Sequence, residues 1–261
     1  MADENKKKVL VVGATRGLGK ALAEDYVKHG WQVYGTLRSD SPPDIKDVNW
    51  IPNIDVATPE AGQTLIKPLP KNTTLSLVII SAGVFIKESF EEPDFDAQVQ
   101  MYKTSAIGPI FLVQALFKGS HLPSGSKVIL VSSEAGSITL RHEQEGGGNY
   151  GHHASKAALN MVGKLLSLDL KEHGVAVGLV HPAFMRTEMT KNVGFDKFWD
   201  DGGAVTPEES ASSLREWIDK EFDISKTGEY WAPRGPRDIG TAEPVLGKDS
   251  EVLKTPMHVP W

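Results

Sequence analysis

The sequence contains no cysteine, and this absence excludes several kinds of chemistry at once. Without thiols the chain can form no disulfide, no thiolate metal site and no cysteine nucleophile. A protein that has no disulfide to maintain is compatible with a reducing compartment. We therefore predict a cytoplasmic location.

Long apolar segments and an excess of positive charge are also lacking. No stretch approaches the roughly 20 apolar residues that span a bilayer, so we expect no membrane partner. Residues 1–8 are polar and include three lysines, and they lead into an apolar run without the core of a secretory signal. The formal net charge of -6 leaves no broad basic face, which argues against nucleic acid as a partner.

What the chain does contain is typical of a globular protein. Its 261 residues are 40% hydrophobic and 24% charged, within the normal range for a folded domain. One doubly wound domain with its loops can reach this length. No internal repeat or Pro/Gly/Ser linker divides the sequence, so we predict a single domain over residues 1–261.

Short apolar, β-branched runs alternate with stretches of helical periodicity. Val9–Val12 is the first such run, and runs of this kind mark strands that are buried on both faces of a parallel sheet. Further candidate strands lie at 32–37, 49–54, 75–81, 127–132, 175–181 and 229–231. The alternation predicts an α/β fold with right-handed crossovers, a Rossmann-like doubly wound parallel sheet. Its ligand is expected beyond the carboxyl ends of the strands.

A glycine-rich turn, Gly13-Ala14-Thr15-Arg16-Gly17-Leu18-Gly19, follows the first strand directly. Gly13 allows a tight turn, Gly17 lets the backbone approach a pyrophosphate, and Gly19 lets the next helix pack closely. The amino end of that helix would face the anion. Because the turn lies between a strand and a helix, it predicts dinucleotide binding rather than a purely structural turn.

The spacing Gly-x-x-x-Gly-x-Gly resembles that of the short-chain dehydrogenase/reductases. Asp55-Val56 and Ser81-Ala82-Gly83 resemble further motifs of this family, with Ser81 in place of an asparagine, and the ending Val259-Pro260-Trp261 resembles that of carbonyl reductases of the C-factor and sniffer type. Alone, Asp55 is equally well interpreted as a turn former, and Ala82-Gly83 as the end of a strand. The resemblance implies cofactor contacts at Gly13, Thr15, Arg16, Gly17, Leu18, Gly19, Asp55, Val56, Ala82 and Gly83.

Two arginines bear on the choice between NADP(H) and NAD(H). Arg38, at the end of the second candidate strand, holds the position expected to face the adenosine 2′ group, where arginine accommodates a phosphate. Arg16, inside the glycine turn, can approach the same phosphate. Either one also fits a solvated surface charge, but the pair favours NADP(H) as the cofactor.

The resemblance extends to the catalytic residues, with two departures. Ser133 matches the family's substrate-facing serine, although a serine-rich turn is the simpler interpretation of that motif alone. Lys156 matches the lysine that binds the nicotinamide ribose and lowers the pKa of the catalytic tyrosine. Four residues before it, however, stands His152 where the family has that tyrosine, and Ser105 replaces the family's asparagine.

His152 has its own chemistry. A nearby Lys156 cation should lower its pKa from about 6.5, which leaves a neutral imidazole that can donate a hydrogen bond or act as a base. Tyr150, two residues earlier, would face another side of the helix and cannot simply replace the missing tyrosine. We expect His153 to face solvent, and adjacent helical histidines do not converge on one metal ion, so no metal is predicted.

Beyond the sixth candidate strand, His181-Pro182-Ala183 resembles the family's Pro-Gly motif, with Ala183 in place of glycine. The resemblance implies that the Met185 backbone and the Thr187 hydroxyl hold the nicotinamide carboxamide. The aromatic-rich segment 184–203 is interpreted as an apolar lid over the substrate, although its apolar residues also fit a core. Residues 232–261 are expected to form an extended tail.

These observations favour an NADPH-dependent reductase that acts on a C=O, C=N or activated C=C bond of a hydrophobic small molecule. A cyclase, isomerase or dehydratase that uses His152 as a base remains open, as does a binding protein that senses NADP(H). Family members commonly form dimers or tetramers, so the resemblance implies a homodimer or homotetramer through helices near 107–118 and 154–173.

Overall fold

One mixed sheet organises the part of the chain that the computed structural model describes, residues 6–261. Its eight strands lie in the order β3-β2-β1-β4-β5-β6-β7-β8. The strands are β1 (Lys8–Val12), β2 (Gln32–Thr36), β3 (Val48–Ile51), β4 (Leu77–Ile80), β5 (Lys127–Val131), β6 (Ala176–Val180), β7 (Tyr230–Ala232) and β8 (Met257–His258). Strands β1 to β7 pair in parallel, and the chain crosses over after β3 to place β4 beside β1. The predicted Rossmann-like α/β fold with a single domain is confirmed.

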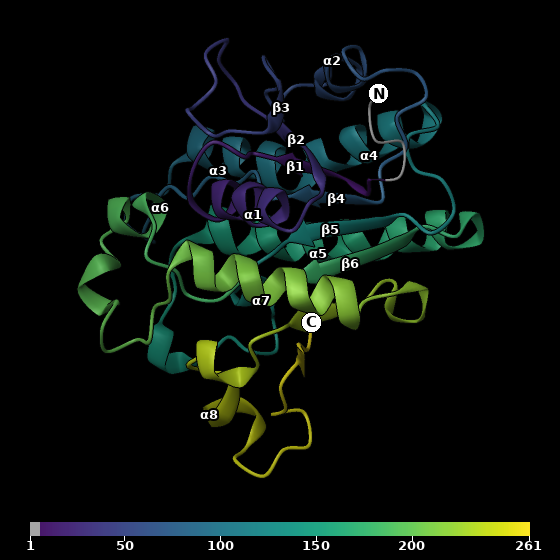
Figure 1. The fold of residues 1–261 in the computed structure, drawn as a ribbon. Coiled ribbons are helices and arrows are strands. Elements are labelled where there is room, and N and C mark those ends of the chain that lie inside the picture. Colours follow the sequence, from purple (N-terminus) through teal and green to yellow (C-terminus); the bar gives the residue numbers. More distant parts are fainter. Residues whose placement is uncertain (1–5) are drawn as a thin grey trace.

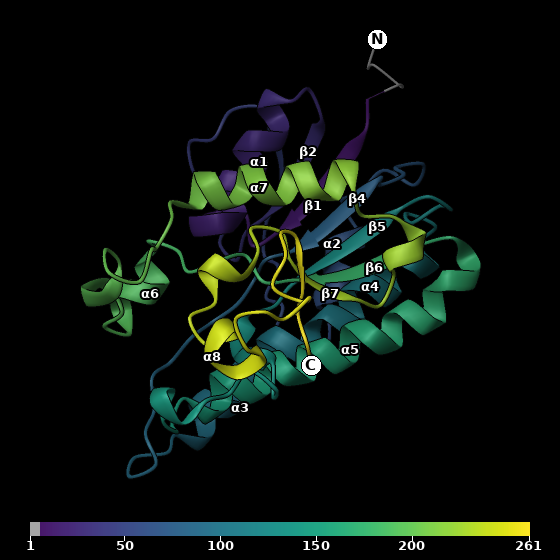
Figure 2. The same cartoon turned by 90° about the horizontal axis from the view of Figure 1, so that it is seen from below.

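Helices cover both faces of this sheet (Figures 1 and 2). They are α1 (Gly17–Lys28), α2 (Ala61–Ile66), α3 (Phe95–Tyr102), α4 (Gly108–Lys118), α5 (Tyr150–Leu170), α6 (Glu188–Asn192), α7 (Pro207–Lys220) and α8 (Ala242–Leu246). Alternate residues of β1 point into two separate cores: Val9 and Val11 pack with α1 and α7, whereas Leu10 and Val12 pack with α4 and α5. Because the sheet is buried on both faces, the sequences of its parallel strands are continuous apolar runs.

The seven predicted strands are present: β1 is one residue longer than predicted, and each of the others is shorter than or shifted by a few residues from its expected range. The eighth strand was missed. Strand β8 has only two residues and pairs antiparallel with β7, joining Trp231 to His258 and Ala232 to Met257. Two residues are too few to produce a period in the sequence.

The two long helices begin elsewhere than predicted. A π-helical turn, Lys103–Ile107, precedes α4, so the predicted helix at 107–118 starts one residue later as α-helix. Helix α5 starts at Tyr150 rather than 154 and ends at Leu170, where a 3₁₀ turn (Lys171–His173) continues it. Within residues 6–261, no helix combines the length and the apolar character needed to cross a membrane.

The lid and the tail are more ordered than expected. The segment 184–203 contains α6 and a 3₁₀ turn (Asp196–Phe198), and α6 lies apart from the packed layers at one end of the molecule (Figures 1 and 2). The segment 232–261 is not simply extended, because it contains α8 and β8. Its end is fixed by hydrogen bonds from Val259 N to Tyr230 O at 2.8 Å and from Thr139 N to Trp261 O at 2.9 Å.

Candidate active site

The glycine turn connects β1 to α1 and packs against the residues that follow β4. Gly13 has a φ of 84°, and a Cβ there would lie 2.9 Å from the Ala82 backbone, so only glycine fits. A Cβ at Gly19 would lie 2.1 Å from the Gly13 carbonyl oxygen, which shows how tightly α1 packs on the turn. Gly17 has room above it, because its nearest neighbour would be Thr187 Cγ2 at 3.7 Å. This cradle at a helix amino end fits a dinucleotide pyrophosphate.

The two arginines lie in different surroundings. Arg38 is exposed and lines a pocket of about 340 Å³ together with Thr15, Ser39, Ser41, Pro42 and Pro43. Arg16 instead pairs with Glu188 at the start of α6, at 3.7 Å, with both side chains largely exposed. Such a pair is weak, about 0–1 kcal/mol, and a phosphate can compete for the guanidinium. The surroundings of Arg38 therefore fit a 2′-phosphate, and Arg16 lies between the glycine turn and α6.

The remaining predicted cofactor residues follow β3 and β4. The Asp55 carboxylate accepts a bond from Ala57 N at 3.0 Å, so Asp55 does form a turn, and its contact with adenine stays a prediction. Val56 is buried, and a Cβ at Gly108 would lie 2.1 Å from its carbonyl oxygen, which requires glycine in the family's Asn-x-x-Gly position. Gly83 faces Lys156: a Cβ there would lie 3.8 Å from the Lys156 Nζ. Leu18 is buried in α1.

Ser132 and Ser133, which directly follow β5, have separate tasks. The Ser132 hydroxyl is buried and donates to Asn160 Oδ1 at 2.6 Å, so it fastens β5 to α5. Ser133 is half-buried, and its Oγ accepts only a local bond from Ala135 N at 3.2 Å. The hydroxyl proton of Ser133 remains available to a substrate.

Lys156 is buried beneath this strand end. Its Nζ donates to Val131 O at 2.9 Å, and only 7% of the residue is exposed. Burial lowers its pKa from 10.5 to about 8, because a low-dielectric surrounding disfavours the ammonium. At neutral pH Lys156 is still mostly protonated and can donate to an oxygen ligand.

His152 lies one helical turn before Lys156 and packs face to face on Phe85. Their ring centroids are 4.0 Å apart, and the planes differ by 16°. Burial, and then the charge of Lys156, lower the His152 pKa well below 6.5. The predicted direction is confirmed, although burial outweighs the lysine as its cause. His152 is a neutral imidazole at pH 7, and its Nδ1 is buried with no hydrogen-bond partner in the described structure.

Of the two side chains next to His152 in the sequence pattern, His153 lies in a different environment from the one predicted, and Tyr150 does not. His153 does not face solvent: it is half-buried, because its Nδ1 lies 3.0 Å from Asn149 O and its ring packs edge-on against that of His152. Tyr150 is the first residue of α5 and is 41% exposed, away from the buried side chains of His152 and Lys156. The expectation that Tyr150 does not replace the missing tyrosine is consistent with this placement.

Ser105 lies within the π-helical turn that connects α3 to α4. Only 1% of it is exposed, and its Oγ is a second buried polar atom with no partner in the described structure. Buried hydroxyl groups are normally hydrogen-bonded. Together with His152 Nδ1, it marks polar groups at this end of α5 that a ligand or water would satisfy.

A strained residue precedes the segment 184–203. Ala183 has a φ of 99°, where glycine is favoured, at the position of the family's glycine. Beyond it, the Thr187 Oγ1 accepts from Thr190 N at 3.3 Å and caps α6, while Met185 O accepts from Thr190 Oγ1 at 2.8 Å. Phe195 then packs edge-on against Phe85, with centroids 5.7 Å apart. The segment 184–203 thus contacts the ring that packs on His152.

Sequence reasoning missed two contacts of this site. Nothing in the pattern pairs Phe85 with His152, since they belong to different elements. His181, noted only as part of the Pro motif, accepts a bond at Nδ1 from Glu134 N at 3.0 Å and so fixes the residue after Ser133. Burial lowers the His181 pKa, which keeps this nitrogen unprotonated. The only signal in the sequence was the position of His181 directly after the strand β6, where residues of the site are expected.

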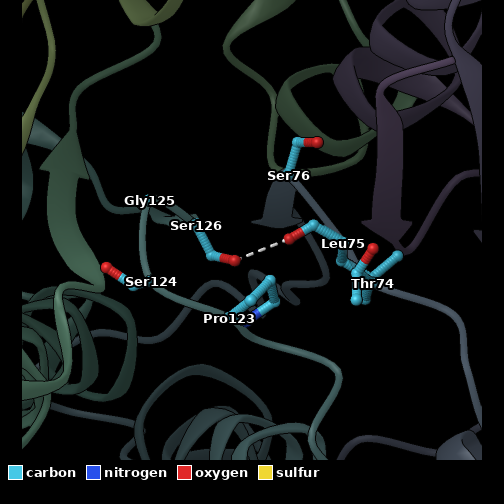
Figure 3. Close-up of a pocket in the computed structure, with 7 residues that line it drawn as sticks. All are labelled: Thr74, Leu75, Ser76, Pro123, Ser124, Gly125 and Ser126. Carbon is cyan, nitrogen blue, oxygen red and sulfur yellow. Dashed lines mark hydrogen bonds between the residues drawn. The ribbon is translucent and has the colours of Figure 1, made fainter. Parts of the chain in front are cut away.

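A smaller cavity of about 160 Å³ lies at the amino ends of the strands, where β4 and β5 begin (Figure 3). It is lined by Thr74, Leu75, Ser76, Pro123, Ser124, Gly125 and Ser126. The Ser126 hydroxyl there donates to Leu75 O at 2.7 Å, which joins two loops. None of the candidate site residues lines this cavity. The candidate site is at the carboxyl ends of the strands, where ligands of such sheets bind.

A glycine cradle between β1 and α1, with a serine after β5 and a buried lysine on α5, defines a class: oxidoreductases of the α/β type that depend on a nicotinamide dinucleotide. Residues 7–197 match the family model described as short chain dehydrogenase. The chain belongs to this family and is an oxidoreductase of this type.

Individual relatives agree with this assignment. A protein of Rhodococcus sp. strain AD45, 1-hydroxy-2-glutathionyl-2-methyl-3-butene dehydrogenase, is 30% identical over 213 residues, which are 81% of this chain and 90% of the relative. The carbonyl reductase Sniffer of D. melanogaster has a similar fold, with a TM-score of 0.73 at 21% identity over 98% of this chain and 100% of that one. An NADPH-bound carbonyl reductase from chicken fatty liver gives 0.70 at 24% identity over 87% and 96%.

Proposed function

We propose that this protein is an NADPH-dependent reductase of a hydrophobic small molecule, with an active site that works without the family's tyrosine. The observation that carries the proposal is the pairing of Lys156 with His152. Both residues are buried on one face of α5, one turn apart, and the Lys156 Nζ lies near Gly83. The residues of the cradle and the pocket at Arg38 support NADP(H), and the chicken reductase of similar fold holds NADPH.

Each residue has a role that its surroundings permit. Lys156 donates to the ribose hydroxyls of the cofactor, because its ammonium is held near Gly83 at the edge of the cradle. Ser133 donates its hydroxyl proton to the substrate. His152 forms a wall of the substrate site, and Ser105 supplies a second buried hydroxyl beside α5. When bound, the cofactor supplies a hydride.

The lowered pKa of His152 favours one substrate class among the three that the sequence left open. A neutral imidazole is a poor donor of a full proton, which reduction of a ketone requires. An iminium carbon accepts hydride to give an amine without any proton being added, so C=N reduction loses least when the tyrosine is replaced. We therefore place cyclic or conjugated iminium compounds first, ahead of ketones and activated alkenes.

A second function remains open for the same site. A buried imidazole with an unpaired nitrogen can accept a proton, as a cyclase, isomerase or dehydratase would require. The experiment that separates the functions is a substrate panel of iminium compounds, ketones and activated alkenes, followed by NADPH absorbance and product mass. The proposal predicts NADPH loss matched by a mass gain of the product. Product formed without NADPH loss supports the non-redox function, and NADPH binding without turnover supports a sensor.

We also propose that the protein is a homodimer or homotetramer through the outer faces of α4 and α5. These helices carry exposed apolar side chains: Ile110, Phe111, Met161, Leu165 and Leu168. The predicted cytoplasmic location stays a proposal, which cell fractionation tests.

A further inference from the structure

Glu88 is a buried carboxylate that the proposed reaction does not use. It lies in the loop after β4 and is only 6% exposed. One carboxylate oxygen accepts a bond from the Gly151 amide, and the other accepts from Gln98 Nε2 at 2.8 Å and from Asp94 N at 3.3 Å. The Glu88 carbonyl oxygen also accepts from Asn149 N at 3.0 Å. One residue thus connects its loop to α3 and to the beginning of α5.

Helix α5 needs this connection, because it has no cap of its own. Asn149 adopts a left-handed conformation, with a φ of 50°, and its side chain makes no capping bond. The first amides of a helix have no partner within it, and a negative charge near them is favourable. Glu88 provides both an acceptor and the charge from a distant part of the chain.

The charge on Glu88 is maintained in the folded protein. Burial by itself would raise the carboxyl pKa, but the bonds from the Gly151 amide and the Gln98 side chain outweigh it, and the pKa is lowered overall. Glu88 is therefore ionised at neutral pH. Its stabilising contribution is present above the ordinary pKa of a glutamate and is lost as the pH falls through the lowered value.

The position of Glu88 links it to both rings of the aromatic stack. Gly151, whose amide it accepts, directly precedes His152, and Phe85 lies three residues before Glu88 on the same loop. The start of α5 lies close to α3 and to the Glu88 loop. A Cβ at Gly151 would lie 3.0 Å from Gln98 Cα, and one at Gly148 would lie 3.3 Å from Glu88 O. A change at Glu88 therefore moves the loop of Phe85 relative to the helix of His152.

We propose that Glu88 is a positioning residue that clamps the Phe85 loop to the start of α5 and so fixes the plane of the His152 imidazole at the active site. Its effect on turnover rests on the proposed function of His152. The clamp itself is independent of that function, because it concerns only the Glu88 bonds and the stack of Phe85 on His152.

The test is the variant Glu88→Gln in the full-length protein, followed by NMR of the histidine ring protons. The amide keeps the size of the side chain but turns one acceptor into a donor that faces other donors, so a bond is lost. We expect the His152 ring protons to lose the upfield shift that the Phe85 ring causes. Their chemical shifts should approach those measured for His152 in the variant Phe85→Leu. The NADPH dissociation constant should stay at the wild-type value, while kcat for an iminium substrate should fall by about 10–100-fold.

Glu91→Gln is the matched control, because it makes the same change at an exposed position of the same loop. It should leave the histidine spectrum and turnover unchanged. Wild-type His152 shifts retained in the folded Glu88→Gln variant would overturn the proposal.

If the variant does not fold, hydrogen exchange of the wild-type protein decides. The Gly151 amide, in the first turn of α5, should be protected at neutral pH and should lose protection on acidification. Exchange of Gly151 as fast as an exposed amide at neutral pH would also overturn the clamp. Neither readout requires turnover, so a wild-type protein that reduces no substrate would contradict only the proposed function.

Discussion

The Lys156 ammonium donates to the Val131 carbonyl oxygen at 2.9 Å, deep beneath the end of β5. This bond holds the ammonium in place for a ligand. Burial of the charge, however, lowers the stability of the fold. Burial lowers the Lys156 pKa from 10.5 to about 8, a difference equivalent to about 3 kcal/mol. The charged lysine therefore opposes folding at neutral pH while it serves the site.

Replacing this lysine should stabilise the ligand-free protein. We expect Lys156→Met to raise the free energy of unfolding at pH 7 by about 1–2 kcal/mol, because the buried charge outweighs one hydrogen bond. Between pH 8 and 10.5 the lysine is protonated in the unfolded chain but largely deprotonated in the folded protein. The wild type therefore gains stability as the pH rises through this range, and the difference in free energy of unfolding between variant and wild type becomes smaller. Urea unfolding at pH 7 and pH 10 measures this. NADPH binding should weaken in the same variant.

Lys164→Met, at an exposed position of the same helix, is the control and should change stability little. A Lys156→Met protein that is less stable than the wild type at pH 7 would show that the ammonium stabilises the fold.

Ala183 is expected to cost stability through its backbone. Its φ of 99° is strained for alanine by about 1–3 kcal/mol, and glycine relieves the strain while adding some entropy to the unfolded chain. Ala183→Gly should therefore raise the free energy of unfolding by about 1 kcal/mol, measured by urea titration. Ala154→Gly, in the regular helix α5, should lower it by about 0.5–1 kcal/mol. If the two substitutions changed the free energy of unfolding equally, the backbone of Ala183 would not be strained.

Arg38 should decide the choice of cofactor. A charge-assisted bond to the 2′-phosphate is worth about 1.5–3 kcal/mol, so Arg38→Ala should weaken NADPH binding by about tenfold or more. NADH binding should not change. Calorimetry with both cofactors measures this, and Arg237→Ala serves as a control at an exposed arginine elsewhere. Equal affinity of the wild type for NADPH and NADH would refute the assignment.

The outer face of α5 should carry a subunit contact. Met161, Leu165 and Leu168 lie at helical spacing on one side and are 60%, 52% and 60% exposed. Light scattering at micromolar concentration should show a dimer or tetramer, and Met161→Glu with Leu165→Glu should yield monomers. Ile224→Glu, at an exposed apolar residue outside these helices, should leave the assembly intact. A monomeric wild type would contradict this contact.

Local patterns explain which features were predictable from the sequence. The strand, glycine turn and helix at 9–28 follow from neighbouring residues, and the spacing of His152 and Lys156 places them on one helical face. The Phe85 stack and the Glu88 bonds join segments far apart in the chain, so no local pattern records them. The start of α5 was misplaced for the same reason, since its cap comes from Glu88 rather than from the residue before the helix.

The most direct test of the account is reduction of a simple ketone by the wild type and by His152→Tyr, with NADPH consumption and product mass recorded. His152 stands in the family's tyrosine position, one turn from Lys156, and its pKa is lowered well below 6.5. Tyrosine there would restore a proton donor, so the variant should reduce the ketone faster than the wild type. His152→Ala should impair iminium reduction more than it impairs NADPH binding. A wild type that reduces the ketone as fast as His152→Tyr would contradict the account.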